Sequence, residues 1–464
     1  MNFIYNIGIG AYVAGIKLAA ACGHRKAKLM EEGRKDWAVR LQAQVDAVKA
    51  RLGHDPRFIW FHAASLGEFE QGRPLIEALH ERYPEYQILQ TFFSPSGYEV
   101  RKNYKGADVI CYLPYDKVDD CRKFLDITHP ERAFFVKYEF WGNMLEELYR
   151  RAVPTYLVSG IFRPNQVFFK WYGGIMRPVL SLFQYKFVQD EQSAELLRGL
   201  GHQHVAVCGD TRFDRVIAIQ QQAKVLPWAE EISEVSGCKE VSGSEVSGFR
   251  VSGCKPFVLV AGSSWPKDED IILDHYNRHP EMRLIIAPHE IHEEHVQQII
   301  AKLKRPYLRY SELKKLWEEG KVPEGQLPSA AQANNTLSFG EGQGEAAPCL
   351  IIDAIGFLSS IYRYGDVAYI GGGFGVGIHN TLEAAVYGMP VIFGPNHQAF
   401  REALGLIDAK GGFPIASAAD YERLMNTFMS DSSALKEAGE KAGNYVKEGS
   451  GATEMIFKAV FGAK

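Results

Sequence analysis

Residues 365–400 join a short apolar run to a glycine-rich loop and a helical pattern, and no other stretch constrains the fold as strongly. They read GDVAYIGGGFGVGIHNTLEAAVYGMPVIFGPNHQAF. Residues 367–370 predict a buried strand and residues 381–387 predict a helix. Five of the seven residues 371–377 are glycine, so this connection holds no regular structure. A buried strand followed by a glycine loop and a helix indicates an α/β unit.

The same loop predicts an anion site, because glycine lets backbone N–H groups approach a phosphate and a helix start adds partial positive charge. Glu383 stands in the first helical turn, where its carboxylate can accept hydrogen bonds from sugar hydroxyls. The dinucleotide spacing Gly-x-Gly-x-x-Gly occurs in no register. A plain buried strand followed by a capped helix is the less favoured alternative. The candidate binding residues are Gly372, Gly373, Gly375, Gly377, Asn380 and Glu383.

Length, charge and cysteine usage restrict the class of protein. A chain of 464 residues favours two α/β domains of about 200 residues each. A formal net charge of -4 argues against nucleic-acid binding, which needs a basic field. The seven cysteines include no C-x-x-C pair, so they indicate neither a disulfide framework nor a zinc site. A reducing compartment fits this usage.

The N-terminus predicts a helix that associates with a membrane. Residues 3–22 are apolar or small except for Asn6 and Lys17, and a basic segment, residues 24–28, follows. Charge after the apolar run, and not before it, favours a retained anchor with a cytoplasmic flank over a secretory signal. Lys17 makes a full crossing costly, so an interfacial helix and an ordinary core helix both remain open.

The next part of the chain alternates predicted strands with helices, which indicates a doubly wound parallel sheet. Glu68 lies where the first of these strands passes through a glycine turn into a helix, the place where open α/β sheets bind ligands. The predicted strands are residues 57–63, 86–93, 109–113, 133–136, 155–159 and 185–189.

A serine- and glycine-rich segment with four Val-Ser-Gly repeats predicts a flexible linker at residues 229–255. A second parallel sheet is expected after it. We therefore expect an anchor helix at 1–22 and domains at 23–228 and 256–464. The strands of the second sheet are predicted at residues 257–261, 283–288, 350–352, 367–370 and 390–393.

Nine motifs, in order along the chain, resemble the Kdo (3-deoxy-D-manno-octulosonic acid) transferases of lipopolysaccharide synthesis, which are GT-B glycosyltransferases. The resemblance implies two Rossmann-like domains that face a cleft. The motifs are FHAASLGEFEQGRPLIEAL, TFFSPSGYE, YLPYD, KYEFWGN, FVQDEQSAELLRGLG, GDTRFD, AGSSWPKDED, IIDAIGFLSSIYRYGDVAYIGGGFGVGIHNTLEAA and FGPNHQAF.

The resemblance implies transfer of Kdo from CMP-Kdo to a lipid A precursor, lipid IV(A), with inversion at the anomeric carbon and without a metal or other cofactor. Glu68 matches the family's proposed base. Glu139, in KYEFWGN, matches the second glutamate of the family motif Glu-x-Glu-x-Trp-Pro-Asn. Lys137 replaces the first glutamate of that motif, and Gly142 replaces its proline. Glu139 is expected to hold an acceptor hydroxyl, and helix capping is the alternative role for either carboxylate.

On the donor side the resemblance implies phosphate contacts from Arg212, where the family commonly has Lys, and from Ser263, Ser264 and Lys267. His289 keeps the histidine of a family motif whose arginine is absent here, so it is expected near the cytidine. The neighbouring run EIHEEH suggests a metal cluster less than an exposed charged helix. The implied location is the cytoplasmic face of the inner membrane.

Two other functions stay open. The chain could be a GT-B enzyme that uses a UDP-sugar, which competition by UDP rather than CMP would indicate. It could also be a non-catalytic, membrane-bound protein that binds sugar nucleotides, in which case loss of the Glu68 carboxylate would leave its cellular function intact.

Overall fold

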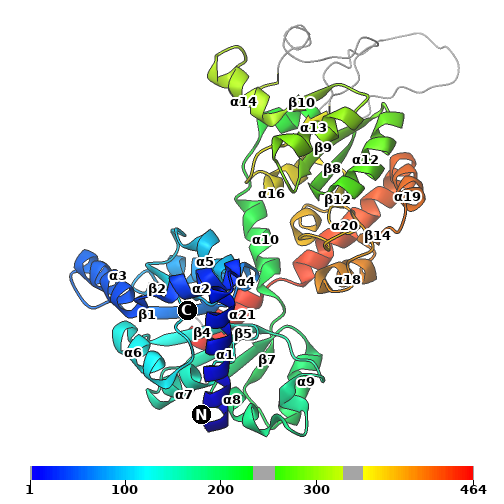
Figure 1. The fold of residues 1–464 in the computed structure, drawn as a ribbon. Coiled ribbons are helices and arrows are strands. Elements are labelled where there is room, and N and C mark those ends of the chain that lie inside the picture. The colour runs from blue at the N-terminus through cyan, green and yellow to red at the C-terminus, as the bar shows by residue number, and fades with distance from the viewer. Residues whose placement is uncertain (1–2, 234–255, 328–348, 463–464) are drawn as a thin grey trace, which may run out of the picture. The chain divides into compact units, whose positions relative to one another are not determined.

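A computed structural model describes residues 3–233, 256–327 and 349–462, and these form two compact units (Figure 1). Unit 1 comprises Met1–Arg215 and Gly449–Lys464, and unit 2 comprises Val216–Glu448. Each unit contains a seven-stranded sheet in which every described pair of strands is parallel. The expected α/β class with two doubly wound sheets is confirmed.

The sheet of unit 1 has the strand order β3-β2-β1-β4-β5-β6-β7. The chain runs outward from β1 to β3 and then returns to the other side of β1 with β4, so the winding reverses between these two central strands. Ile59 of β1 lies opposite Ile88 of β2 on one side and Arg132 of β4 on the other. The strands are β1 Phe58–Ala63, β2 Gln87–Phe92, β3 Val109–Tyr112, β4 Arg132–Val136, β5 Thr155–Gly160, β6 Tyr185–Val188 and β7 Val205–Val207.

Helices cover both faces of this sheet, which explains why β1, with the sequence FIWFHA, is buried at all six positions. Phe58 and Trp60 face a core built with α3, α6, α7, α8 and α9, whereas Ile59 and Phe61 face a core built with α4 and α21. The helices of unit 1 are α1 Phe3–Ala21, α2 Arg25–Arg34, α3 Trp37–Leu52, α4 Leu66–Arg82, α5 Pro95–Arg101, α6 Val118–Thr128, α7 Gly142–Arg150, α8 Arg177–Ser181, α9 Glu191–Gly199, α10 Thr211–Gln221, which continues into unit 2, and α21 Ala452–Phe461, with short 3-10 turns η1 Val167–Phe169 and η2 Gly173–Ile175.

The division of the chain differs from the expected boundaries at 228 and 256. It falls after Arg215 and again after Glu448, because Ile456 and Phe457 of the last helix pack into the core of unit 1. Unit 1 therefore contains two segments that are far apart in the sequence. The Val-Ser-Gly repeats lie in residues 234–255, outside the described residues.

Unit 2 repeats the plan with the strand order β10-β11-β9-β8-β12-β13-β14. Its strands are β8 Phe257–Ser264, β9 Met282–Pro288, β10 Tyr307–Arg309, β11 Cys349–Ile351, β12 Val367–Ile370, β13 Val391–Phe393 and β14 Gly412–Pro414. Its helices are α11 Pro227–Ser233, α12 Pro266–Arg278, α13 Glu293–Lys302, α14 Tyr310–Glu318, α16 Leu358–Ile361, η3 Tyr362–Tyr364, α17 Leu382–Ala385, α18 Arg401–Asp408, α19 Ala418–Ser430 and α20 Ser432–Glu448. The sequence analysis misses β7, β10 and β14, three-residue edge strands too short to show a period.

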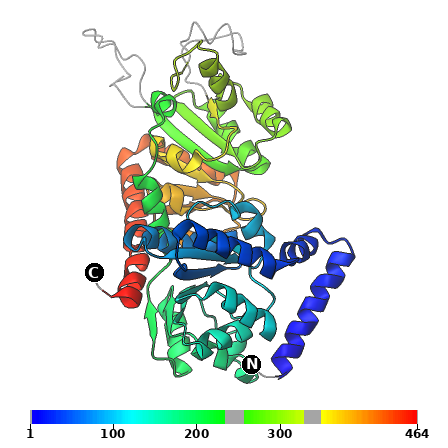
Figure 2. The ribbon, with the colours of Figure 1, turned by 90° about the vertical axis from the view of Figure 1, so that its left-hand side faces the viewer.

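Helix α1 forms where the apolar N-terminal helix is predicted, and Figure 2 shows it in dark blue along the outside of unit 1. Among the described residues it is the one helix long and apolar enough to cross a membrane, which is weak evidence by itself. Val13 is its buried residue, whereas Phe3 and Leu18 are 79% and 68% exposed. An exposed apolar surface of this extent is typical of contact with lipid or with a partner.

Candidate active site

The two predicted carboxylates of unit 1 follow the two strands between which the winding reverses. Glu68 lies in the first turn of α4, directly after β1, and Glu139 lies in the loop between β4 and α7. Because β1 and β4 are parallel neighbours, their carboxyl ends share one edge of the sheet. This is the position at which open α/β sheets bind ligands.

Glu68 is half-buried and is held by the residue that begins its helix. The Ser65 hydroxyl donates to Glu68 Oε2, and Ser65 is the N-cap of α4 in extended conformation. A carboxylate in a first helical turn is stabilised by the partial positive charge of that turn. Glu68 is therefore a fixed acceptor group at the sheet edge, as a general base requires.

Glu139 is almost fully buried and accepts two hydrogen bonds on one oxygen. His62 Nε2 lies 2.9 Å from Glu139 Oε2, and Trp141 Nε1 donates to the same oxygen at 2.7 Å. The other oxygen, Oε1, has no hydrogen bond among the described residues. The loop leaves β4 through Lys137, whose φ of 63° lies in the left-handed region that side chains rarely adopt. This strained loop fixes one carboxylate oxygen of Glu139 and leaves the other accessible.

The residues behind His62 determine which of its nitrogens carries the proton. Trp60 Nε1 donates to Thr91 Oγ1 at 2.8 Å, so the threonine oxygen acts as an acceptor there. The nearest acceptor for the Thr91 hydroxyl proton is His62 Nδ1, also at 2.8 Å. His62 Nδ1 is then an acceptor, and the Nε2 proton is donated to Glu139. Sequence analysis missed His62 and Thr91, which are adjacent only through the pairing of β1 with β2.

Arg212 lies in unit 1, not in the unit that holds the other candidate donor-binding residues. Its guanidinium donates to Asp210 Oδ2 through Nε at 3.0 Å and through a terminal nitrogen at 2.8 Å. Asp210 also accepts from Gln71 of α4. The arginine is thus held at the start of α10 by a carboxylate, and about a quarter of its side chain is exposed, at 28%.

The glycines of the loop after β12 serve close packing in unit 2. A Cβ on Gly371 would lie 2.1 Å from the Ser263 carbonyl oxygen, and one on Gly373 would lie 2.5 Å from the Gly394 nitrogen. Most amides of the loop already have protein acceptors: Gly371 donates to Gly262 O, Gly372 to Asp268 Oδ2, and both Gly375 and Gly377 to Gly372 O. This hydrogen-bond pattern does not agree with the prediction that the loop binds a phosphate mainly through its N–H groups.

Glu383 stands at the start of a helix shorter than predicted. Residues 381–387 were expected to be helical, but α17 spans only Leu382–Ala385, so little helix dipole acts there. Asn380 Nδ2 donates to Glu383 Oε1 at 3.0 Å, and Asn380 Oδ1 accepts from the Leu382 amide. These two residues form one small polar group, in which Glu383 is half-buried.

The serines and the lysine after β8 have different environments. Ser264 is fully buried and donates to Glu269 Oε1 at 2.9 Å, so its hydroxyl supports the protein rather than a phosphate. Ser263 is half-buried with a φ of 53°, and Lys267 is exposed in the first turn of α12. Of the three, Ser263 and Lys267 are accessible to an anion.

His289 follows β9 and belongs to a stack of three rings. The centroid of its imidazole lies 4.8 Å from that of Trp265 and 4.4 Å from that of His379, and both neighbouring rings are nearly parallel to it. Trp265 Nε1 also donates to His379 Nε2 at 3.3 Å. Sequence analysis missed Trp265 and His379, although each lies within one of the motifs on which the family resemblance depends. Stacked rings with an exposed edge can bind a planar base.

Both histidines of the EIHEEH run have partners within the protein. His292 caps α13 by accepting from the His295 amide, and His295 Nε2 faces the buried Glu269 at 3.0 Å. Among the described residues, no group of three or more His, Cys, Asp or Glu side chains could hold a metal ion.

Residues 35–215 match the family model for 3-deoxy-D-manno-octulosonic-acid transferase (kdotransferase). A 3-deoxy-D-manno-octulosonic acid transferase from Haemophilus influenzae is 24% identical over 402 residues, which cover 84% of this chain and 82% of the relative. Two solved structures share the fold. UDP-GlcNAc 2-epimerase from Neisseria meningitidis has a TM-score of 0.52 at 12% identity and covers 88% of this chain and 100% of its own. MurG from Acinetobacter baumannii has a TM-score of 0.50 at 11% identity and covers 87% and 100%.

Two units with doubly wound parallel sheets give the GT-B fold, and the similarity to Kdo transferases supports a glycosyltransferase. The match over residues 35–215 and the similarity to relatives along most of the chain specify it further. Together these similarities support a Kdo transferase.

The first prediction concerns the hydrogen bond between His62 and Glu139. We expect His62→Leu to lower kcat roughly tenfold or more, because Glu139 loses a donor that fixes its position. His62→Gln, whose amide nitrogen can replace Nε2, should recover most of that loss. Steady-state kinetics with the thermal midpoint as a folding check tests this, and equal losses in both variants would contradict a donor role for Nε2.

The second prediction concerns acid stability of unit 2. Burial is the largest cause that lowers the pKa of His275 and of His379 to about 4. Unfolded histidine titrates near about 6.5, so the unfolded chain binds more protons between these values and stability falls as pH drops from about 6.5 to 4. His275, with neither ring nitrogen hydrogen-bonded among the described residues, is the simpler group to replace.

We expect His275→Phe to reduce the fall in thermal midpoint between pH 7 and pH 5, measured by circular dichroism. His80→Phe, at an exposed position of α4, is the matched control and should keep the full pH dependence. An unchanged pH dependence in His275→Phe would contradict the assignment.

Proposed function

We propose that the chain transfers Kdo from CMP-Kdo to the lipid A precursor lipid IV(A), with inversion, at the cytoplasmic face of the inner membrane. The observation that carries this proposal is the placement of Glu68 and Glu139 at the reversal of the first sheet in a chain similar to Kdo transferases. No cofactor enters the scheme.

The two carboxylates take different parts of the reaction. Glu68 accepts the proton of the attacking acceptor hydroxyl, because it is accessible and its helix start holds it in place. Glu139 Oε1 accepts a hydrogen bond from an acceptor hydroxyl and orients it, since Oε2 is already held by two N–H donors. Inversion requires a single displacement, so no covalent sugar–enzyme bond is needed.

Unit 2 binds the donor in this scheme. The Trp265–His289–His379 stack offers its exposed edge to the cytosine ring, and Lys267 and Ser263 donate to the phosphate. Glu383, oriented by Asn380, accepts from ribose hydroxyls. Stabilisation of the leaving CMP phosphate by these donors lowers the barrier to displacement.

Membrane association is supported by two surfaces of unit 1. Helix α1 exposes an apolar stripe and is followed by the basic residues 24–28, which anionic lipid attracts. Trp171, 91% exposed, and Tyr172 form a second aromatic surface near η2. An enzyme whose acceptor cannot leave the membrane gains effective concentration by binding there.

The test of the function is direct. Full-length protein in detergent is incubated with CMP-Kdo and tetraacylated lipid A precursor, and the product is weighed by mass spectrometry. A mass increase of one or more Kdo residues is expected. Turnover with a UDP-sugar and none with CMP-Kdo would replace the proposal with the alternative GT-B activity.

The third prediction tests the base. Glu68→Gln is nearly isosteric but cannot take the proton, so we expect kcat to fall by roughly 10²–10⁴-fold with CMP affinity nearly unchanged. Glu81→Gln, at an exposed position of the same helix, is the control and should retain wild-type turnover. A Glu68→Gln variant with more than a tenth of the wild-type kcat would remove Glu68 from this role.

The fourth prediction tests the donor site. Glu383→Ala should weaken CMP binding by roughly 1–3 kcal/mol in calorimetry, because ribose hydroxyls lose a charged acceptor. Glu448→Ala, exposed at the end of α20, is the control for a lost carboxylate in the same unit. Equal CMP affinity in the two variants would restrict Glu383 to capping its short helix.

A further inference from the structure

The start of α7 is capped by residues that lie far away in the sequence, one of them in α1. An α-helix leaves its first amides without intrahelical acceptors, and the N-cap residue Trp141 supplies none from its side chain. Tyr5 Oη accepts from the Gly142 amide at 2.8 Å, and Asp116 accepts from the amides of Asn143 and Met144 at 3.0 and 2.8 Å. The first three amides of α7 are therefore satisfied by two residues.

Tyr5 and Asp116 also bind each other, so the cap is one unit. The Tyr5 hydroxyl donates to Asp116 Oδ2 at 2.6 Å, and Asn6 Oδ1 accepts from Asn143 Nδ2 at 2.7 Å. Asp116 and Asn143 are buried, where a lost hydrogen bond is costly. Helix α1 is thus hydrogen-bonded to Gly142, the residue at which the loop that carries Glu139 ends.

A second contact joins α1 to the same loop. Tyr12 stacks on Phe93 with ring centroids 6.2 Å apart, and Phe93 stacks on Trp141 at 4.5 Å. Trp141 is the residue whose Nε1 donates to Glu139. Val13 of α1 and Phe93 share a small apolar cluster against which Ala64, in the loop before Glu68, and Trp141 also pack. Both carboxylate loops therefore adjoin α1.

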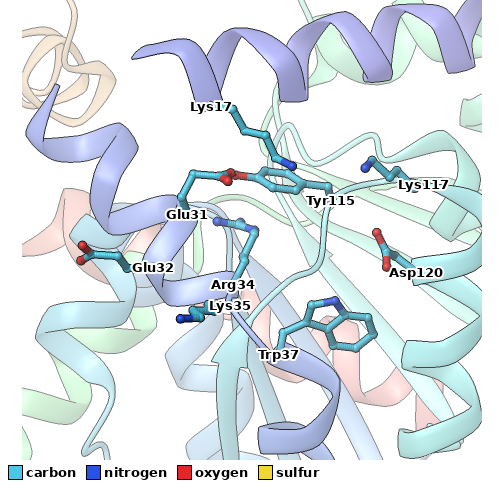
Figure 3. Close-up of a pocket in the computed structure, with 9 residues that line it drawn as sticks. All are labelled: Lys17, Glu31, Glu32, Arg34, Lys35, Trp37, Tyr115, Lys117 and Asp120. Atoms are coloured by element: carbon cyan, nitrogen blue, oxygen red, sulfur yellow. The ribbon is translucent and has the colours of Figure 1, made fainter. Parts of the chain in front are cut away.

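The far end of α1 is supported by its corner with α2. In Figure 3, Lys17 of α1 points toward Tyr115, and Glu31 of α2 lies beside that ring. These residues line a cavity of about 420 Å3. The Tyr115 hydroxyl donates to Glu31 at 2.5 Å, and the buried Arg34 donates to the carbonyls of Leu113 and Phe93. The lining of this cavity mixes both signs of charge, and the hydrogen bonds of Glu31 and Arg34 hold α2, the neighbour of α1, against the rest of unit 1.

One face of α1 therefore packs against the rest of unit 1, and the other face is exposed. Tyr5, Asn6, Ile9, Val13 and Ile16 face unit 1, whereas Phe3, Ile4, Ile7 and Leu18 are exposed. A helix that crosses the bilayer would have to give up the hydrogen bonds of Tyr5 and Asn6 in a medium without water to replace them. The contacts favour a helix that lies in the interface with its exposed face toward lipid.

We propose that Tyr5 is a positioning residue for Glu139, and that α1 is a part of the acceptor site and not only a membrane anchor. This inference rests on the proposed Kdo transfer. Without the Tyr5 hydroxyl, the Gly142 amide and Asp116 lose a shared partner, and the start of α7 can shift. Glu139 lies three residues before that start, so its oxygen moves relative to the acceptor hydroxyl that it orients.

The test compares Tyr5→Phe with Tyr149→Phe, which removes a hydroxyl from an exposed position on the same α7. Both full-length variants are assayed with acceptor dispersed in detergent, where a tether to the membrane is not needed. We expect kcat of Tyr5→Phe to fall about tenfold, with the KM for CMP-Kdo and pelleting with anionic phospholipid vesicles unchanged. Tyr149→Phe should match wild type in all three measurements.

A double variant separates positioning from a general loss of structure. If Tyr5 acts through Glu139, then Tyr5→Phe should cause little further loss in a Glu139→Gln background. Multiplying losses would overturn the proposal, and so would a Tyr5→Phe variant that keeps wild-type kcat or that loses only vesicle binding. Should Tyr5→Phe fold poorly, Tyr12→Leu, which breaks the stack on Phe93, provides the same comparison with the same outcomes.

The outcome is distinguishable from failure of the proposed function. If the wild-type chain transfers no Kdo, the proposed function fails and the Tyr5 comparison has no reference rate. If wild type is active and Tyr5→Phe equals it, only the positioning role is lost.

Discussion

Parallel strands deliver all their carboxyl ends to one edge of a sheet, and both units of this protein depend on that constraint. In unit 1 it brings the carboxyl ends of β1 and β2 and the loop after β4 together, so that residues 62, 91 and 139 form one buried hydrogen-bonded chain. A buried imidazole and a buried carboxylate are each costly alone, but together they satisfy each other. The sheet therefore makes the Glu139 site possible, and the buried pair in turn fixes the central strands.

Unit 2 meets the same constraint with different chemistry. Asp268 is fully buried, yet it accepts from the hydroxyl of Tyr369 and from the amides of Gly372 and Trp265. Burial raises the pKa of this carboxyl, and the three donors oppose that shift. Asp268 thus fixes the start of the glycine loop by accepting from the Gly372 amide. Since most amides of this loop already have protein acceptors, the side chains that follow it, in particular Asn380 and Glu383, are more available to a ligand than its backbone.

Much of the fold could be predicted from the sequence, because strand and helix patterns are local. The central strands and the junction positions of Glu68 and Glu139 follow from apolar runs that end in glycine or polar residues. Partners across strands could not be predicted, which is why His62 and Thr91 were missed. The glycine loop was interpreted as a phosphate cradle because composition does not reveal that Asp268, about a hundred residues earlier, already accepts one of its amides. The division into units differs from the expected domain boundaries for a similar reason, because the last helix packs with the first unit.

Helix α1 shows most clearly how one stretch can satisfy two environments. Read as hydropathy, Tyr5 and Asn6 are mild interruptions in an apolar run, and nothing local shows that they face a buried aspartate and asparagine. Their hydrogen bonds explain why an apolar helix packs against the rest of unit 1 while its other side stays exposed. A lipid acceptor presents its reacting hydroxyl at a set height above the membrane surface. In the proposed reaction, α1 would contact both lipid and the Glu139 loop and so would fix the height of that carboxylate by direct contact, which a flexible tether of the same affinity could not do.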